Sequence, residues 1–183
     1  QIYRDAFENH VYDVEYLSAE QIREMEPEVS PDVLGGLYIP REGVIDPFLL
    51  VVAEAENASE NGVEFLLDAA VTDIKTENGG IYAVGTTRGT IRTNYVINAA
   101  GLFCDEIAGM AGEGGDFVVK PRKGQFFILD RNTECRTSHI IYPIPTPETR
   151  GKLLLQTVHG NMLLGPTAED LEDKEDHGVT ADE

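Results

Sequence analysis

Two groups of residues in this sequence have side chains that could do chemistry on a small substrate. His159 follows an apolar run and precedes a glycine, so its imidazole could accept a proton or contact an anion. Lys120, Arg122 and Lys123 place three of the 14 basic residues within four positions, and such a cluster can bind a carboxylate or a phosphate. A hydrogen-bonded structural histidine and a solvated basic patch are the ordinary alternatives.

Three further residues could line a binding pocket. Tyr38 and Tyr142 lie in apolar stretches and could present a hydroxyl group at a pocket wall, although aromatic residues in strands more often belong to the core. Arg41 follows an apolar stretch and precedes a turn, which makes it another candidate for binding an anion.

Several other kinds of site are not indicated. The sequence has no Gly-x-Gly-x-x-Gly turn after a strand, no phosphate-binding loop, no Gly-x-Ser-x-Gly and no His-Glu-x-x-His. Residues 173–177 superficially resemble a calcium loop, but the required glutamate at its twelfth position would lie beyond residue 183, so no metal is expected. Cys104 and Cys135 are expected to be reduced and packed.

The composition limits the partners. The 183 residues include 14 Lys and Arg against 33 Asp and Glu, a formal charge of −19 that disfavours nucleic acid and anionic membranes. With 42% hydrophobic residues the chain can form one core, and we expect a cytoplasmic protein, with a peripheral membrane location of a longer parent as an alternative. The start at Gln1 and the charged end suggest a segment of something longer.

Three helices are expected. Ser18 and Gln21 form a capping box for a helix over 18–26, and Asp46-Pro47 starts a helix over 47–61 with one buried apolar stripe and Gly62 as its C-terminal cap. A short helix is expected over 103–111, and none of comparable strength follows it.

The strand signals are more numerous. Asn78-Gly79-Gly80 predicts a tight turn and antiparallel pairing. The acidic run 169–176, in which Lys174 is the one cation, is expected to be a solvated turn or helix end. The expected strands cover residues 31–40, 63–75, 81–87, 91–92, 95–101, 117–119, 125–129, 139–144, 153–158 and 162–164.

Three phrases in the sequence form one pattern. The first is residues 39–47, Ile-Pro-Arg-Glu-Gly-Val-Ile-Asp-Pro, and the second is residues 95–101, Tyr-Val-Ile-Asn-Ala-Ala-Gly. The third pairs Lys-Pro-Arg-Lys-Gly-Gln at 120–125 with His-Gly-Asn-Met-Leu-Leu-Gly-Pro-Thr at 159–167. Together they resemble the FAD-dependent oxidoreductases of the D-amino-acid-oxidase superfamily, most closely the branch with glycerol-3-phosphate dehydrogenases and L-2-hydroxyglutarate dehydrogenases or oxidases.

The resemblance implies a fold and a division of the chain. It implies an α+β internal fragment with a mixed, mostly antiparallel sheet and flanking helices: the substrate domain of a flavoprotein plus part of its FAD-binding domain. Residues 63–112 would be partial FAD-domain elements, residues 10–62 and 113–168 substrate-domain elements, and residues 169–183 an acidic tail.

The resemblance also implies an activity: oxidation of glycerol 3-phosphate, or a related 2-hydroxy acid, by FAD. Because the pyrophosphate-binding turn is not among the 183 residues, FAD is expected in a longer parent and not in this fragment. The partners would be a small anionic substrate and an undetermined electron acceptor, without nucleic acid or metal. The implied roles are catalysis for His159, substrate binding for Arg122, Lys123, Arg41 and Tyr142, and cofactor binding for Val71, Ala99, Ala100, Gly101 and Gly165.

Two alternatives stay open on the sequence. An amino-acid oxidase type of flavoenzyme would use the same cofactor on a carbon that bears an amine. A binding module without flavin would explain the missing glycine-rich turn. For Ala99, Ala100 and Gly101 the structural alternative is close packing of a helix against a strand.

Overall fold

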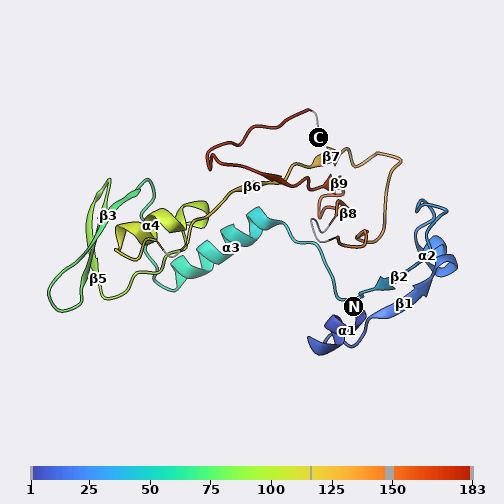
Figure 1. Ribbon diagram of the computed structural model, residues 1–183, viewed down its shortest axis with the longest axis horizontal. Helices are drawn as coiled ribbons and strands as arrows, with labels where there is room; N and C mark the ends of the chain where they lie inside the picture. The colour runs from blue at the N-terminus through green and yellow to red at the C-terminus, as the bar shows by residue number, and fades with distance from the viewer. Residues whose placement is uncertain (1, 116, 147–150, 182–183) are drawn as a thin grey trace. The chain divides into compact units, whose positions relative to one another are not determined.

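The computed structural model describes residues 2–115, 117–146 and 151–181 and divides the chain into two compact units (Figure 1). Unit 1 comprises the residues up to Ala53 together with Gly124–Ala168. Unit 2 comprises Glu54–Lys123 together with the residues from Glu169 onward. Each unit therefore combines two separate stretches of the sequence. The predicted α+β class, with antiparallel sheets and flanking helices, is confirmed.

Unit 1 contains two small antiparallel sheets. In the first, β1 pairs with β2, and Glu15 lies opposite Tyr38. In the second, the strand order is β7-β9-β8, and Met162 in the central strand is fully buried. The elements of this unit are α1 (Ile2–Glu8), β1 (Glu15–Ser18), α2 (Ala19–Met25), β2 (Gly35–Tyr38), the start of α3 (Pro47–Glu60), β7 (Phe127–Leu129), β8 (Leu153–Gln156) and β9 (Met162–Gly165).

The capping box at the start of α2 forms as predicted. The Ser18 hydroxyl oxygen accepts a hydrogen bond from the Gln21 backbone N–H at 3.3 Å, and the Ser18 N–H donates to Gln21 Oε1 at 2.9 Å. The helix ends at Met25, before Pro27, whose ring restricts the residue ahead of it to extended backbone. The sequence signals for this helix therefore gave both of its ends.

Helix α3 begins and ends where the sequence predicts. The Asp46 carboxylate accepts hydrogen bonds from the N–H groups of Phe48 (2.9 Å) and Leu49 (3.0 Å), and Gly62 at φ 89° closes the other end. The prediction of one buried stripe is wrong, because Phe48 is 82% exposed and no residue of the helix is buried. The reason is that five consecutive apolar residues, 48–52, cover more than one full turn, so their side chains are spread around the helix axis and do not form one face.

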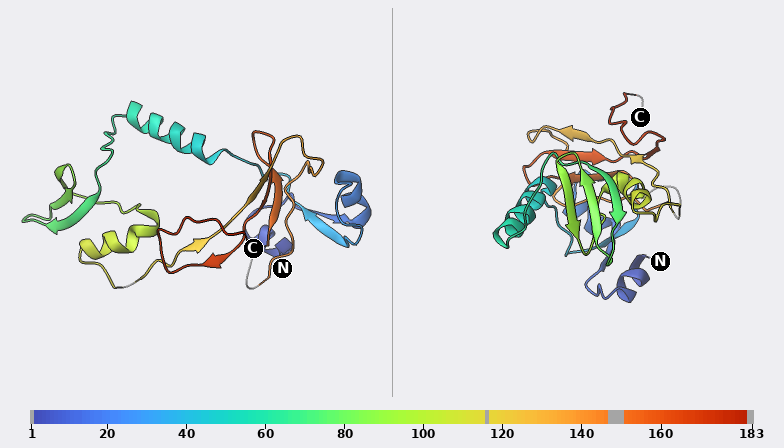
Figure 2. Two further views of the ribbon diagram at one scale, coloured as in Figure 1. Left: turned by 90° about the horizontal axis from the view of Figure 1, so that it is seen from above. Right: turned by 90° about the vertical axis from the view of Figure 1, so that its left-hand side faces the viewer.

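Unit 2 is built on a three-stranded antiparallel sheet in the order β3-β4-β5, which the right-hand view of Figure 2 shows as neighbouring green arrows. Ile74 and Ala83 are buried in it, and α4 packs against β3. The predicted turn at 78–80 joins β3 to β4. The elements are the rest of α3, β3 (Val71–Thr76), β4 (Tyr82–Thr86), β5 (Gly89–Thr93), the 3-10 helix η1 (Gly101–Phe103), α4 (Cys104–Met110), β6 (Arg122–Lys123) and β10 (Glu169–Asp170).

Several expected strands are absent from the described residues. Residues 63–70 and 95–100 are not strands; in the second segment Asn98 turns back to bond the next helix. Residues 117–119 are not a strand either, and 139–144 contribute only a single bridge between Ile141 and Leu154. Apolar composition alone suggested these strands, but a strand also needs a partner for its backbone groups. No helix follows α4 in the described part of the chain, as predicted.

The acidic run 169–176 differs from the expected solvated turn. Its first two residues form β10, which pairs antiparallel with β6, so that Glu169 lies opposite Lys123 and Asp170 opposite Arg122. The Leu171 N–H continues this pairing by donating to the Pro121 carbonyl at 2.9 Å. The difference is explained by charge, because Asp170 and Glu169 form ion pairs with Arg122 and Lys123. Among the described residues, no helix is both long and apolar enough to cross a membrane.

Candidate functional site

Two of the predicted site residues contact one segment of unit 1, residues 41–46, and a third belongs to this segment. Arg41 is part of this segment and is exposed. The Tyr142 hydroxyl donates a hydrogen bond to a carboxylate of the segment at 2.5 Å, and the His159 imidazole lies 2.9 Å from another. The partners are Asp13 for Arg41, Glu42 for Tyr142 and Asp46 for His159.

The contact between His159 and Asp46 fixes which ring nitrogen is available. Asp46 Oδ1 is occupied by the α3 cap, and Oδ2 lies against His159 Nε2. The cap hydrogen bond from Leu49, followed by the contact with His159, lowers the pKa of Asp46, so this carboxylate is ionised and can only accept. The Nε2–H of His159 therefore donates to it, and Nδ1 is the nitrogen that can take a proton. With 68% of its side chain exposed, His159 is accessible to a ligand.

Tyr142 is held as a protonated phenol. Its hydrogen bond to Glu42, with a smaller contribution from burial, raises the pKa of Tyr142 to about 12. At neutral pH the hydroxyl is a hydrogen-bond donor and is already committed to Glu42. Half of the residue remains exposed.

The cationic cluster predicted to bind an anion is in unit 2, and two of its three members pair with the acidic tail. Arg122 Nε lies 3.1 Å from Asp170 Oδ1, with both side chains more than half exposed. Lys123 Nζ lies 3.3 Å from Glu169 and 3.6 Å from Asp176, and only 11% of its side chain is exposed. Lys120 is exposed.

The surroundings of Lys123 favour its charged form. Burial acts to lower its pKa, but the ion pairs with Glu169 and Asp176 outweigh this, and the net pKa is raised above the ordinary value. Lys123 is therefore a charged group with two carboxylates at hand. A substrate anion would have to displace or share them, whereas the more exposed Arg122 keeps an accessible face.

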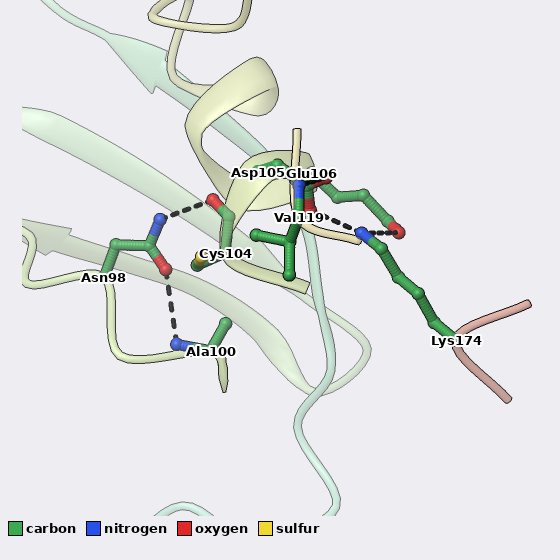
Figure 3. Close-up of polar contacts among 7 residues, drawn as sticks. All are labelled: Asn98, Ala100, Cys104, Asp105, Glu106, Val119 and Lys174. Atoms are coloured by element: carbon green, nitrogen blue, oxygen red, sulfur yellow. Dashed lines mark hydrogen bonds and ion pairs between the residues drawn. The ribbon is translucent and has the colours of Figure 1, made fainter. Parts of the chain in front are cut away.

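The Asn-Ala-Ala-Gly phrase forms a turn that leads into η1 and then α4 (Figure 3). Asn98 Nδ2 donates to the Cys104 carbonyl at 2.7 Å, and the Ala100 N–H donates to Asn98 Oδ1 at 3.3 Å. Ala99, Ala100 and Gly101 are exposed, and Gly101 adopts φ 56°, which favours glycine. The asparagine of this phrase thus shapes the turn with its own side chain.

The residues of unit 2 that were predicted to hold FAD leave space for a ligand at the turn. A Cβ atom placed on Gly101 would meet no described atom within 4 Å, so the turn has open space beside it. Val71, half-buried at the start of β3, belongs to the strand against which α4 packs. Gly165 in unit 1 has a different explanation, because a Cβ there would lie 2.8 Å from the Gln125 carbonyl oxygen and from Phe126.

A separate ion pair joins the acidic tail to the start of α4 (Figure 3). Lys174 Nζ lies 2.5 Å from Asp105 Oδ1 and 3.3 Å from Glu106. Asp105 Oδ2 also accepts a hydrogen bond from the Val119 N–H at 2.9 Å. Lys174, followed by the Val119 N–H, lowers the pKa of Asp105 to about 2.

A pocket of about 200 Å³ lies in unit 1 beneath α2. Tyr38 and Tyr142 both contribute to its wall, and most of the other lining residues are apolar. Its buried charged group is Glu26, whose Oε1 accepts hydrogen bonds from the backbone N–H groups of Ser138 and His139 and lies 2.7 Å from His139 Nδ1. A pocket with a buried carboxylate and apolar walls repels an anion, so it does not suit an anionic substrate.

Sequence reasoning missed the partners of its candidates. Glu26 before Pro27 gave no signal of a contact with His139, more than 100 positions away. The pairing of Asp46 with His159 was also missed, because Asp46 was explained fully as a helix cap. Lys174 could have been singled out as the one cation in the run 169–176. In the described ranges, no three His, Cys, Asp or Glu side chains are grouped to hold a metal ion.

Comparison with known proteins decides the family. The sequence pattern of the DAO family, described as FAD dependent oxidoreductase, matches residues 1–183. The chain belongs to this family. The resemblance recognised in the three phrases is thereby confirmed, and family membership favours a flavoenzyme over the alternative of a binding module.

The relatives found include proteins that are named for two related substrates. The chain is 38% identical over 174 residues to glycerol 3-phosphate dehydrogenase of Caloramator mitchellensis, covering 95% of the chain and 36% of that protein. It is 29% identical over 156 residues to L-2-hydroxyglutarate dehydrogenase of Escherichia coli O17:K52:H18, covering 84% and 36%.

A solved structure shows the same fold with the cofactor. Dithionite-reduced L-alpha-glycerophosphate oxidase from Mycoplasma pneumoniae with FAD bound is 30% identical, with a TM-score of 0.81 over 95% of this chain and 48% of that one. The chain spans less than half the length of each of these three relatives.

Proposed function

We propose that the whole protein to which this chain belongs is an FAD-dependent oxidoreductase that oxidises the CH–OH group of glycerol 3-phosphate, or of a closely related 2-hydroxy acid. The observation that carries this proposal is the 38% identity to a glycerol 3-phosphate dehydrogenase over 95% of the chain. The substrate would be small and anionic.

Different residues of the chain would bind FAD, accept the substrate proton and bind the substrate anion. Val71, Ala99, Ala100 and Gly101 would contact FAD, since the turn at 99–101 is exposed, has small side chains and has open space beside Gly101. Gly165 stays a weaker candidate because its own packing already requires glycine. When bound, FAD supplies the acceptor for the hydride that leaves the substrate carbon.

His159 would accept the proton of the substrate hydroxyl. Its Nε2–H donates to the ionised Asp46, which orients the ring and leaves Nδ1 as the acceptor. The negative charge of Asp46 would also stabilise the imidazolium that forms after proton transfer. Asp46 is in turn fixed by the first turn of α3.

Arg41 is the anion anchor that fits best with this base. It belongs to the same segment as Glu42 and Asp46, the partners of Tyr142 and His159. Its side chain is 76% exposed, so its guanidinium group has room for a phosphate or carboxylate beside Asp13. Lys123, with its two carboxylate partners, is better explained as a structural cation, and Arg122 is the second candidate.

The test is a comparison of arginine variants in the full-length flavoprotein. Arg41→Ala should lower kcat/KM for glycerol 3-phosphate by roughly 10- to 150-fold, the range for one charge-assisted hydrogen bond. It should leave kcat/KM for glycerol, which lacks the anion, unchanged. Arg23→Ala, which removes an exposed arginine of α2, is the matched control.

Other outcomes of this test would change the residue assigned as anion anchor or the substrate class. If Arg122→Ala gives the loss and Arg41→Ala does not, the anchor lies in unit 2. If the protein binds FAD but oxidises an amino acid and neither glycerol 3-phosphate nor a 2-hydroxy acid, the amine alternative replaces the proposed activity.

A further inference from the structure

The one cation of the acidic run 169–176 reaches the start of α4 (Figure 3). Lys174 Nζ contacts Asp105 and Glu106, and it lies 5.6 Å from the centre of the Phe103 ring. Phe103 is the last residue of η1, and Asp105 and Glu106 lie in the first turn of α4. One side chain of the tail thus forms ion pairs with two carboxylates of the first turn of α4 and lies over the aromatic ring that precedes this turn.

The same helix start is bonded to the turn that precedes it. The Asn98 amide donates to the Cys104 carbonyl at 2.7 Å, and the Phe103 N–H donates to the Ala100 carbonyl at 3.0 Å. These two bonds join the turn to Phe103 and Cys104, the residues directly before Asp105, so the turn and the helix start form one hydrogen-bonded piece. A displacement of Asp105 would therefore be passed to Ala100 and Gly101.

The ion pair is well placed to hold this piece. The side chains of Lys174 and Asp105 are only 16% and 11% exposed. Asp105 binds Val119 with its second oxygen, so it also ties α4 to the segment leading to β6. The tail that delivers Lys174 is itself fixed by the pairing of β10 with β6.

We propose that Lys174 is a positioning residue for FAD: through Asp105 it holds the turn at residues 98–101 in the conformation that receives the cofactor. This inference rests on the proposed role of Ala99, Ala100 and Gly101 in binding FAD. It assigns the acidic tail a part in cofactor affinity, although the tail itself need not touch the cofactor.

The experiment measures the Kd of FAD for the full-length apoprotein by quenching of flavin fluorescence. Lys174→Ala should raise this Kd about fivefold or more, the lower end of coupling between distinct sites. Lys174→Arg, which keeps the cation opposite Asp105, should restore most of the affinity. Lys152→Ala, which removes an exposed lysine of unit 1, should leave the Kd unchanged.

Hydrogen exchange of the apoprotein gives a second readout. In Lys174→Ala the amide of Phe103, which bonds to Ala100, should exchange faster, while the amides of β4 should not. A merely stabilising ion pair would lower the melting temperature without this local change. A Kd for Lys174→Ala within twofold of the wild-type value would overturn the proposal.

A glycine variant separates the two claims. Gly101→Val places a β-branched side chain at φ 56° in the turn and should abolish tight FAD binding. If Gly101→Val loses FAD and Lys174→Ala does not, the positioning role fails while the cofactor role of the turn stands. If Gly101→Val keeps FAD, the assignment of the turn itself fails.

Discussion

At the scale of single residues, Asp46 combines two tasks. One carboxylate oxygen caps α3, and the other orients His159. The sequence predicted the cap because Asp-Pro is a local signal, and it singled out His159 by its position beside Gly160. Their contact could not be predicted, since 113 positions separate them and no local rule links them.

Separating the two tasks of Asp46 gives a sharp prediction. Asp46→Asn keeps an oxygen for the cap but turns an N–H toward His159, which forces the ring into the other tautomer. In the full-length enzyme kcat should fall roughly 100-fold, the low end of the contribution of a positioned base, while the melting temperature changes little. Asp46→Ala should lower both. An Asp46→Asn enzyme with wild-type kcat would exclude His159 as the base.

Tyr142 offers a second test at this scale. With its pKa raised to about 12 by Glu42, Tyr142 should remain a phenol at pH about 11, where an ordinary tyrosine is largely ionised. The ultraviolet absorbance of phenolate should therefore hardly differ between wild type and Tyr142→Phe at that pH. In a Glu42→Gln background, the same comparison should show one additional phenolate. Equal titration in both backgrounds would contradict the hydrogen bond.

At the scale of elements, helices were predicted better than strands. The ends of α2 and α3 are encoded by caps within a few residues of each end, so the sequence alone could locate them. The segment 95–101 is apolar enough for a strand, but its backbone pairs with no strand among the described residues, and the Asn98 side chain donates to the Cys104 carbonyl. The turn at 78–80 is a local signal for the pairing of β3 with β4, but pairing between strands that no tight turn joins is a long-range choice.

The capping box of α2 can be measured by its contribution to stability. Ser18→Ala removes the acceptor of the Gln21 N–H and should reduce the free energy of unfolding by about 1 kcal/mol in urea denaturation. Ser18→Asp, which keeps an acceptor at the cap, is the matched control and should lose little. A Ser18→Ala protein as stable as wild type would show that the box contributes nothing.

Across the whole molecule, several of the excess carboxylates form ion pairs with basic residues of the same chain. The acidic run 169–176 suggested a solvated turn or helix end, yet it supplies partners for Arg122 and Lys123, and its Lys174 pairs with Asp105. The composition gives the net charge but not the partners of individual side chains. It could not reveal that the chain's own carboxylates would occupy the cluster predicted to bind a substrate anion.

The pair of Asp105 and Lys174 should make stability depend on pH in a defined range. The folded pKa of Asp105, about 2, lies below the ordinary 3.8, so its stabilisation is complete above that ordinary value and is lost as the pH falls toward 2. The difference in unfolding free energy between wild type and Asp105→Asn should be largest at neutral pH and shrink over this range. A difference independent of pH would contradict the lowered pKa.

We propose above that the whole protein transfers a hydride from a CH–OH group to FAD. The most direct measurement mixes the full-length flavoprotein with glycerol 3-phosphate in the absence of oxygen and follows the absorbance of the oxidised flavin. We expect rapid bleaching by glycerol 3-phosphate or by a 2-hydroxy acid such as 2-hydroxyglutarate. Bleaching by an amino acid alone, with both hydroxy compounds inert, would contradict it.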